Sequence, residues 1–134
     1  MEDCLFCKII AGEIPGKKVY EDEFTYVFMD VAKDVDGHML VVPKKHFKNI
    51  LDADEESLKH VILTAQKVSK HLVEDCGYDG IVTLNNNNEC VGQSVFHYHM
   101  HILPKKNADG LAGWPPKFEG AKYDLDEVFN KVKM

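Results

Sequence analysis

The sequence lacks any apolar run near the roughly 20 residues that a helix needs to span a bilayer. It opens with Met1-Glu2-Asp3, which is acidic where a secretory signal carries basic residues. These two absences argue against the membrane-spanning and secreted classes. We therefore expect no membrane partner and a cytoplasmic location.

Positive charge is also in short supply. The 134 residues carry 16 Lys and Arg against 22 Asp and Glu, a formal net charge of -6. Because sequence-independent binding to nucleic acid depends on Lys and Arg that neutralise phosphates, we expect no nucleic-acid partner. Any phosphate site must be local. Its candidates, which equally suit a solvated loop, are Lys44, Lys45, His46 and Lys48.

Linkers, internal repeats and low-complexity segments are missing as well. With 45% hydrophobic and 28% charged residues, the composition is that of a globular chain. A chain of 134 residues is long enough for one packed core and too short for two ordinary domains. We expect a single domain over residues 1–134.

Cysteine is limited to four residues, of which Cys4 and Cys7 form a C-x-x-C pair while Cys76 and Cys90 stand alone. Disulfides are disfavoured in a reducing cytosol. Metal binding, redox chemistry or no role at all are left for the pair, and its spacing does not choose among them.

Hydrophobic periodicity is what the sequence does supply. Residues 54–75 repeat apolar side chains at helical spacing and predict one long helix, capped by Asp52 or Asp54 and ended by Gly77. Strand patterns and turn residues surround it, which indicates an α+β fold. The other expected elements are a short helix or extended strip at 5–10, a hairpin at 19–20 and 24–29, strands at 38–42, 81–84 and 95–103, the last stopping at Pro104, and helical spacing in the tail at 123–134.

The chemistry concentrates in the last of these strands, where His97, His99 and His101 alternate with apolar residues. Side chains on a strand alternate between its two faces, so this spacing predicts three imidazoles in a row on one face. Two interpretations stay open at this point. One is a metal site, since imidazole is a common zinc ligand; the other is nucleophilic and acid–base chemistry.

Five blocks, at residues 6–15, 29–30, 37–46, 92–103 and 114–116, carry a resemblance that covers most of the chain. The fourth contains the H-x-H-x-H run. In this order the blocks resemble those of the histidine triad nucleotide-binding family, in its phosphoramidase-like branch. The resemblance implies an α+β fold with an antiparallel meander sheet and one long helix, and a homodimer in which two such sheets join.

The resemblance also implies an enzyme. In that family a nucleotidyl hydrolase or transferase cleaves at the α-phosphate of purine nucleoside phosphoramidates or dinucleoside polyphosphates, without a catalytic metal. His99 matches the attacking histidine, which forms a nucleotidyl-histidine intermediate that water then cleaves. His101 matches the phosphate-contacting histidine, and Ser94 matches the hydroxyl that meets the leaving group or a phosphate oxygen.

Further positions match the family's contacts to the nucleotide, which is of the AMP or GMP type. Asp30 matches the carboxylate that holds the ribose hydroxyls, although it equally suits a turn cap. Asn86 matches a polar contact, in a register that also allows Asn85 or Asn87. His38 is either a contact or a structural histidine. The remaining candidates are Gln93 and a base slot that would be core in any fold, namely Leu5, Phe6, Ile9, Ile14, Phe28 and Val31.

Some relatives hold zinc on two cysteines and two histidines, and the matching places here are Cys4, Cys7, His46 and His97. Four protein ligands close a tetrahedral site and leave no position for a reacting water. The resemblance therefore implies a structural zinc ion. The alternative is a pair of buried or idle thiols.

Two segments depart from the shortest members of the family: the residues between Pro104 and Trp114, and a C-terminal extension at about 117–134. The family's C-terminal region shapes substrate choice, so phosphoramidate, dinucleoside polyphosphate and aminoacyl adenylate all stay open as substrates. The alternative function is a nucleotide- or zinc-binding interaction module with incidental turnover. His60 and His71 fall on the long helix and are expected to be solvated.

Overall fold

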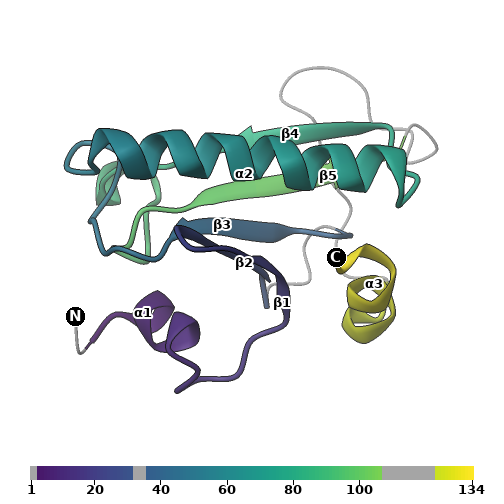
Figure 1. The fold of residues 1–134 in the computed structure, drawn as a ribbon, viewed down its shortest axis with the longest axis horizontal. Coiled ribbons are helices and arrows are strands. Elements are labelled where there is room, and N and C mark those ends of the chain that lie inside the picture. Colours follow the sequence, from purple (N-terminus) through teal and green to yellow (C-terminus); the bar gives the residue numbers. More distant parts are fainter. Residues whose placement is uncertain (1–2, 32–35, 107–122) are drawn as a thin grey trace.

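The computed structural model describes residues 3–31, 36–106 and 123–134. Its elements are α1 (Leu5–Ile10), β1 (Lys18–Glu21), β2 (Thr25–Met29), β3 (Met39–Pro43), α2 (Glu55–Glu74), β4 (Gly80–Leu84), the 3-10 turn η1 (Glu89–Val91), β5 (Met100–Lys105) and α3 (Leu125–Val132). The strands form one antiparallel sheet in the order β1-β2-β3-β5-β4. After β3 the chain passes through α2 to the outer strand β4, and β5 returns beside β3 (Figure 1). The predicted α+β fold is confirmed.

Some predicted features lie outside the described residues. They are the 114–116 block and all but the start of the segment that precedes it. Among the helices that the structure does describe, none combines the length and the apolar character needed to cross a membrane.

Helix α2 forms where the sequence predicts it, because both of its ends are specified locally. Asp54 is the N-cap, and its carboxylate accepts from the N–H of Ser57 at 2.8 Å. At the other end Gly77 adopts a φ of 84°, and the N–H of Tyr78 donates to the carbonyl of Leu72. Both the helix and its predicted caps are confirmed.

The sheet is covered on both faces, and the alternation of side chains along each strand decides which residue faces which helix. On one face Val27 and Val41 join the core built around α2. On the other face Phe28 and Leu40 pack with Phe6 of α1. Helix α1 therefore lies against the face opposite α2, and the N-terminal cysteines are carried to that face.

Helix α3 packs with α2, and His71 links the two helices. Its Nε2 lies 2.8 Å from the carbonyl oxygen of Val132, and its Nδ1 lies 3.0 Å from the carboxylate of Asp75. The prediction that His71 is solvated was wrong, because its partner lies 61 residues further along the chain. His60 is covered in part by the ring of Phe24, with 3.7 Å between ring centroids.

Strand β5 begins at Met100, later than the predicted start at residue 95. The N–H of Tyr98 donates to the carbonyl of Phe47 at 2.8 Å, and the pairing with β3 starts only at Met100. Of the three histidines, only His101 lies in the strand. The other two precede it in an irregular stretch whose side chains are held by individual hydrogen bonds.

The end of β5 also differs from the prediction, because the strand runs through Pro104 to Lys105. Pairing with β3 ends at Ile102, while pairing with β4 continues to Lys105. The proline nitrogen, which has no hydrogen to donate, faces the side where β3 has already ended. Pro104 is tolerated for this reason.

Candidate active site and metal centre

Two clusters of polar side chains lie near the ring of Phe6, on the α1 face of the sheet. We name them the cysteine–histidine cluster (Cys4, Cys7, His46 and His97) and the aspartate–histidine cluster (Asp30, His38 and His101). The ring of Phe6 meets His97 edge-on at 6.0 Å and His99 edge-on at 5.1 Å. The ring of His99 in turn lies 5.0 Å from that of His101. The predicted row of imidazoles therefore exists on one face.

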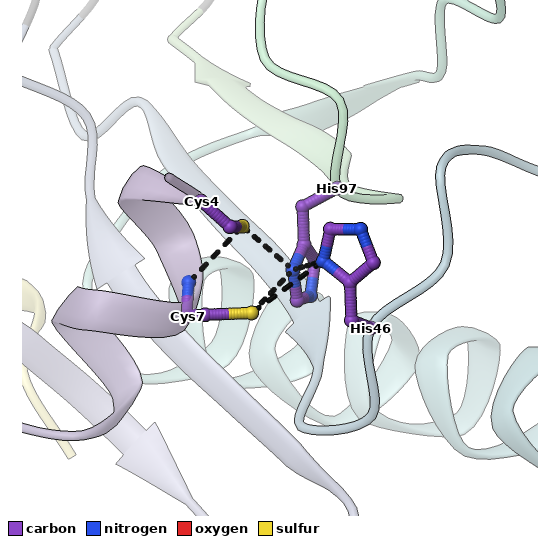
Figure 2. Close-up of side chains that lie close together, drawn as sticks. All are labelled: Cys4, Cys7, His46 and His97. Atoms are coloured by element: carbon purple, nitrogen blue, oxygen red, sulfur yellow. Dashed lines mark hydrogen bonds between the residues drawn. The ribbon is translucent and has the colours of Figure 1, made fainter. Parts of the chain in front are cut away.

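Figure 2 shows the four side chains of the cysteine–histidine cluster pointing towards one another. Cys4 caps α1 and Cys7 lies in its first turn. The Sγ of Cys4 lies 3.3 Å from the Nδ1 of His97, and the Sγ of Cys7 lies 3.4 Å from the Nδ1 of His46. The two Nδ1 atoms are 3.2 Å apart. All four predicted zinc ligands are thus brought together from three separate parts of the chain.

These distances fit a tetrahedral metal ion. Zinc bonds of about 2.3 Å to sulfur and about 2.0 Å to nitrogen place neighbouring sulfur and nitrogen ligands about 3.5 Å apart and two nitrogens about 3.3 Å apart. The distances between sulfur and nitrogen here are 3.3 to 3.5 Å, and the two nitrogens are separated by 3.2 Å. Two thiols and two imidazoles are also donors that zinc prefers. The residues present fit a zinc ion.

A second hydrogen bond orients His97 for this role. Its Nε2 lies 2.8 Å from the carbonyl oxygen of Pro43, which can only accept, so Nε2 carries the hydrogen and Nδ1 presents its lone pair to the cluster. Burial lowers the pKa of His97 to about 4. Burial, and then the neighbouring Cys4, raise the pKa of Cys7 to about 11. Two thiolates this close repel each other, and a divalent cation bound between them would offset that repulsion.

His99 has the opposite orientation. Its Nδ1 lies 2.7 Å from the carbonyl oxygen of His97, so Nδ1 carries the hydrogen and the lone pair is on Nε2. The ring is 6% exposed. Burial lowers its pKa, and the bond to His97 and the charge of Asp30 oppose this only in part. A neutral imidazole with an oriented lone pair is equipped to act as a nucleophile.

The aspartate–histidine cluster joins the end of β2 to the start of β3. The N–H of Asp30 donates to the carbonyl of His38 at 3.0 Å. The Nε2 of His38 lies 2.9 Å from the Nδ1 of His101 and 3.6 Å from the carboxylate of Asp30. The 2.9 Å separation is shorter than the roughly 3.3 Å between nitrogens on tetrahedral zinc, and indicates a hydrogen bond. This row holds the ring of His101 beside that of His99.

Ser94 is exposed and borders an open cavity of about 790 Å³. The cavity extends along the cysteine–histidine cluster, and His99 is not among the described residues that line it. Ser94 therefore borders open space beside the cysteine–histidine cluster. The other lining residues are Asp3, Cys4, Leu5, His46, Val95 and Phe96.

The side chain of Gln93 is 3% exposed, and protein partners occupy all of its hydrogen-bonding positions. Its Oε1 accepts from Asn49 and Asn88. Its Nε2 donates to the carbonyl groups of Lys48 and Val95. The structure thus gives this side chain a scaffolding role. The nucleotide contact of Gln93 stays a prediction, because a motif match does not tell a backbone contact from a side-chain one.

The three candidate asparagines have different partners. Asn85 donates to the carbonyl of His99 at 2.9 Å, whereas Asn86 donates to the carbonyl of Val91 at 2.7 Å. Asn87 accepts from a backbone N–H at 2.8 Å. Asn85 therefore contacts the histidine segment directly, and the nucleotide contact of Asn86 stays a prediction.

The apolar residues of the predicted base slot separate into two groups. Phe6, Ile9 and Phe28 are buried in the core between α1 and the sheet. Val31, by contrast, is 85% exposed. The core packing agrees with the alternative given to these residues above, and their contact with a base stays a prediction.

The lysines considered for a phosphate site form ion pairs instead. Lys44 lies 2.7 Å from Glu21, and Lys45 lies 3.0 Å from Asp54. The ammonium group of Lys48 lies over the ring of Phe96, 5.4 Å from its centroid. Lysines engaged in this way fit a solvated loop better than a local phosphate-binding site.

Sequence reasoning missed two groups that orient the site. The carbonyl of Pro43 fixes the ring of His97, and the amide of Asn49 supports Gln93 across 44 residues. A backbone carbonyl has no sequence signature, and a single asparagine in a loop has a weak one. The run of four asparagines at 85–88 was the only available sign of an amide network.

Comparisons with known proteins agree with this architecture. The HIT domain family matches residues 11–108. The protein "hit" of Bacillus subtilis is 47% identical over 98% of this chain and 92% of its own length, and an adenosine 5'-monophosphoramidase of Schizosaccharomyces pombe is 38% identical over 97% and 98%. A Zn-bound histidine triad family protein from Mycobacterium smegmatis has a TM-score of 0.85 and 28% identity over 98% and 91%. The chain belongs to the HIT domain family.

Proposed function

We propose that this protein is a nucleotide hydrolase in which His99 takes the nucleotidyl group from a nucleoside phosphoramidate or dinucleoside polyphosphate and passes it to water. The observation that carries the proposal is the state of His99, a buried and neutral imidazole whose Nδ1 hydrogen is donated to the His97 carbonyl. Membership of the HIT domain family and the similarity to a protein named adenosine 5'-monophosphoramidase support the same activity.

Two in-line displacements make up the reaction. In the first, with a phosphoramidate, the Nε2 lone pair of His99 forms a bond to the α-phosphorus, the bond from phosphorus to nitrogen breaks, and the amine leaves with a proton taken from solvent. With a dinucleoside polyphosphate, the leaving group is the second nucleotide. In the second displacement, water attacks the phosphorus, the bond to Nε2 breaks, and the nucleoside monophosphate departs while the attacking water gives its proton to solvent. The carbonyl of His97 stabilises the positive charge on the ring of His99 between these steps.

The aspartate–histidine cluster supplies charge and orientation. His101 contacts the phosphate, and the row through His38 to Asp30 fixes the orientation of its imidazole. Asp30 also accepts from the ribose hydroxyls, since a carboxylate suits two O–H donors. Ser94 meets the leaving group. Holding these groups in place is the main task of the protein in phosphoryl chemistry.

Zinc has a structural role in this proposal. Held by Cys4, Cys7, His46 and His97, the ion would tie α1 to the segment that precedes β5. Four protein ligands leave no site for a reacting water, so the ion supplies cross-linking and fixes ligand orientation. A purine base would lie near Val31 and the α1 residues, where an apolar contact discriminates weakly between adenine and guanine.

A homodimer with joined sheets completes the proposal. Strand β4 is one of the two edge strands of the sheet, and its Leu84 is 46% exposed. On α2, Ile62 and Leu63 are more than half exposed. An open strand edge beside exposed apolar side chains is a surface that proteins usually cover. A molar mass by light scattering equal to one chain would contradict this part of the proposal.

The experiment measures AMP release from adenosine 5'-phosphoramidate by the wild-type protein and by His99→Ala, each with and without a chelator. We expect turnover that is lost in His99→Ala and that outlasts the chelator in the wild-type protein. If a chelator stops turnover at once, while the protein is still folded, the chemistry would belong to a metal ion. AMP binding without turnover in the wild-type protein would favour the interaction module instead.

A further inference from the structure

Asn88 is the only residue other than glycine with a positive φ in the described ranges. Its φ of 84° and ψ of 156° lie in a region that glycine adopts and that a β-carbon disfavours. A conformation of this kind persists only where surrounding contacts hold it. The contacts that hold Asn88 therefore identify what the conformation is for.

Three polar groups of Asn88 are bound by the protein. Its N–H donates to Oε1 of Gln93 at 2.8 Å, and its Oδ1 accepts from Nδ2 of Asn49 at 2.9 Å. Its carbonyl accepts from the N–H groups of Val91 and Gln93. Asn49 and Gln93 are buried, which shields these bonds from water. We name Asn49, Asn88 and Gln93 the amide clasp.

The amide clasp fixes the segment that carries Ser94. The Nε2 of Gln93 donates to the carbonyl of Val95 at 3.0 Å, two residues ahead, and to the carbonyl of Lys48 at 2.7 Å. Gly92, with a φ of 95°, makes the turn between Asn88 and Gln93. Ser94 is exposed, so the backbone on either side of it sets the position of its hydroxyl.

We propose that Asn88 is a positioning residue for Ser94, and that the amide clasp holds its glycine-like backbone in the shape that aims the Ser94 hydroxyl at the leaving group. The inference rests on the proposed function and deepens it. It assigns the geometry at the leaving group to a residue that touches no substrate. The clasp also explains why Gln93 is buried beside an exposed serine.

Two substitutions at one position separate the side-chain anchor from the backbone shape. Asn88→Ala removes the Oδ1 acceptor and keeps the β-carbon, so the segment should relax to another conformation. Asn88→Gly removes the same acceptor together with the β-carbon, so the original backbone shape stays accessible. Cys90→Ala, at an exposed position of the same turn, is the matched control.

Amide hydrogen exchange measures whether the amide clasp is intact, without the need for substrate or turnover. We expect faster exchange at the amides of residues 91–93, which donate within this turn, in Asn88→Ala, and near wild-type exchange there in Asn88→Gly and in the control. Protection of α2 should be unchanged in all three. Wild-type exchange in Asn88→Ala would overturn the inference.

Kinetics then test what the clasp does. With adenosine 5'-phosphoramidate, kcat should fall by about 10- to 100-fold in Asn88→Ala, and Asn88→Gly should restore most of it. KM and the affinity for AMP should change by less than about twofold, because the nucleotide contacts are intact. An equal loss in both variants, or a loss of AMP affinity in step with kcat, would overturn the positioning role. Absence of turnover in the wild-type protein would instead refute the proposed function, while hydrogen exchange still decides the clasp.

Discussion

His97 and His99 stand two residues apart and are both buried, yet they present opposite nitrogens. His97 donates its Nε2 hydrogen to the carbonyl of Pro43 and turns Nδ1 towards the cysteines. His99 donates its Nδ1 hydrogen to the carbonyl of His97 and keeps its lone pair on Nε2. Two backbone carbonyls thus fix opposite tautomers. In the proposed roles, the bonded nitrogen, more than the depth of burial, separates a metal ligand from a nucleophile.

The side chains around the two rings also differ, and they suit different chemistry. The cysteine–histidine cluster adds two thiols, which are soft donors for a closed metal site. The aspartate–histidine cluster adds a carboxylate and two imidazoles, which support positive charge and accept from hydroxyls. Substitutions at His99 or in the aspartate–histidine cluster should therefore leave zinc content in place, and loss of zinc should lower turnover without abolishing it.

Replacing His99, the proposed nucleophile, should have the largest effect on the rate of AMP release. Glutamine at position 99 retains a polar side chain of similar reach and removes the attacking nitrogen. We expect AMP release by His99→Gln to fall by at least about 1,000-fold, with zinc content and Tm unchanged. Metal analysis and thermal unfolding provide the control. A loss of zinc in His99→Gln would show that the two roles are not separate.

A substitution in the cysteine–histidine cluster should lower the stability of the fold more than the rate of the reaction. Cys7→Ser should lose zinc, and a zinc ion present at 1,000 times its Kd contributes about 4 kcal/mol to the free energy of unfolding. Turnover should fall by only about 10- to 100-fold, because His99 keeps its bond to the His97 carbonyl. Cys90→Ala, which removes an exposed cysteine, should retain zinc and Tm. Full zinc content in Cys7→Ser would contradict the ligand assignment.

The ribose contact should have a smaller and selective effect. A hydrogen bond to a charged group is worth about 1.5 to 3 kcal/mol, so Asp30→Asn should lower kcat/KM for an adenosine substrate by about 10- to 100-fold. The loss should be smaller for a substrate that lacks both ribose hydroxyls, because that substrate cannot make the contact with either protein. Equal losses on both substrates would place Asp30 outside the ribose contact.

Asp22 lies away from both clusters, so its substitution should change only the stability of the fold, and by a small amount. Burial raises the pKa of Asp22, but hydrogen bonds from Phe24, Thr25 and Tyr20 lower it more, so its pKa lies below the usual 3.8. A lowered pKa stabilises the fold above pH 3.8, and this contribution is lost as the pH falls through the folded pKa. Asp22→Asn should reduce the free energy of unfolding by about 1 kcal/mol at pH 7 and by less at pH 2.

Urea unfolding at the two pH values measures this difference, with zinc content and AMP release as controls. A destabilisation of Asp22→Asn that is the same at both pH values would show that the charge of the carboxylate is not responsible.

What could be predicted from sequence was local. Helix α2 followed from apolar spacing, Asp54 and Gly77, all of which lie within or beside the helix. Strand alternation predicted the shared face of the histidines, although only His101 lies in β5, and the cluster of Cys4, Cys7, His46 and His97 followed from a resemblance. The start of β5 was missed because the N–H of Tyr98 donates to Phe47, about 50 residues earlier, and no periodicity records such a bond.

Tertiary hydrogen bonds account for the remaining differences. His71 has the sequence surroundings of an exposed helix residue, and only the packing of α3 covers it in part. Gln93 matches a nucleotide-binding block, and only the positions of Asn49 and Asn88 show that its side chain is already occupied. The tautomers of His97 and His99 likewise depend on carbonyl groups that sequence patterns do not encode.

The most direct test of the account is to trap the intermediate. The wild-type protein is mixed with adenosine 5'-phosphoramidate, quenched in denaturant within one turnover, and digested for peptide mass spectrometry. We predict one adenylyl group on His99, with His97 and His101 unmodified. An adenylyl group on His101, or a burst of AMP with no adduct on any histidine, would contradict the assignment of His99 as the nucleophile.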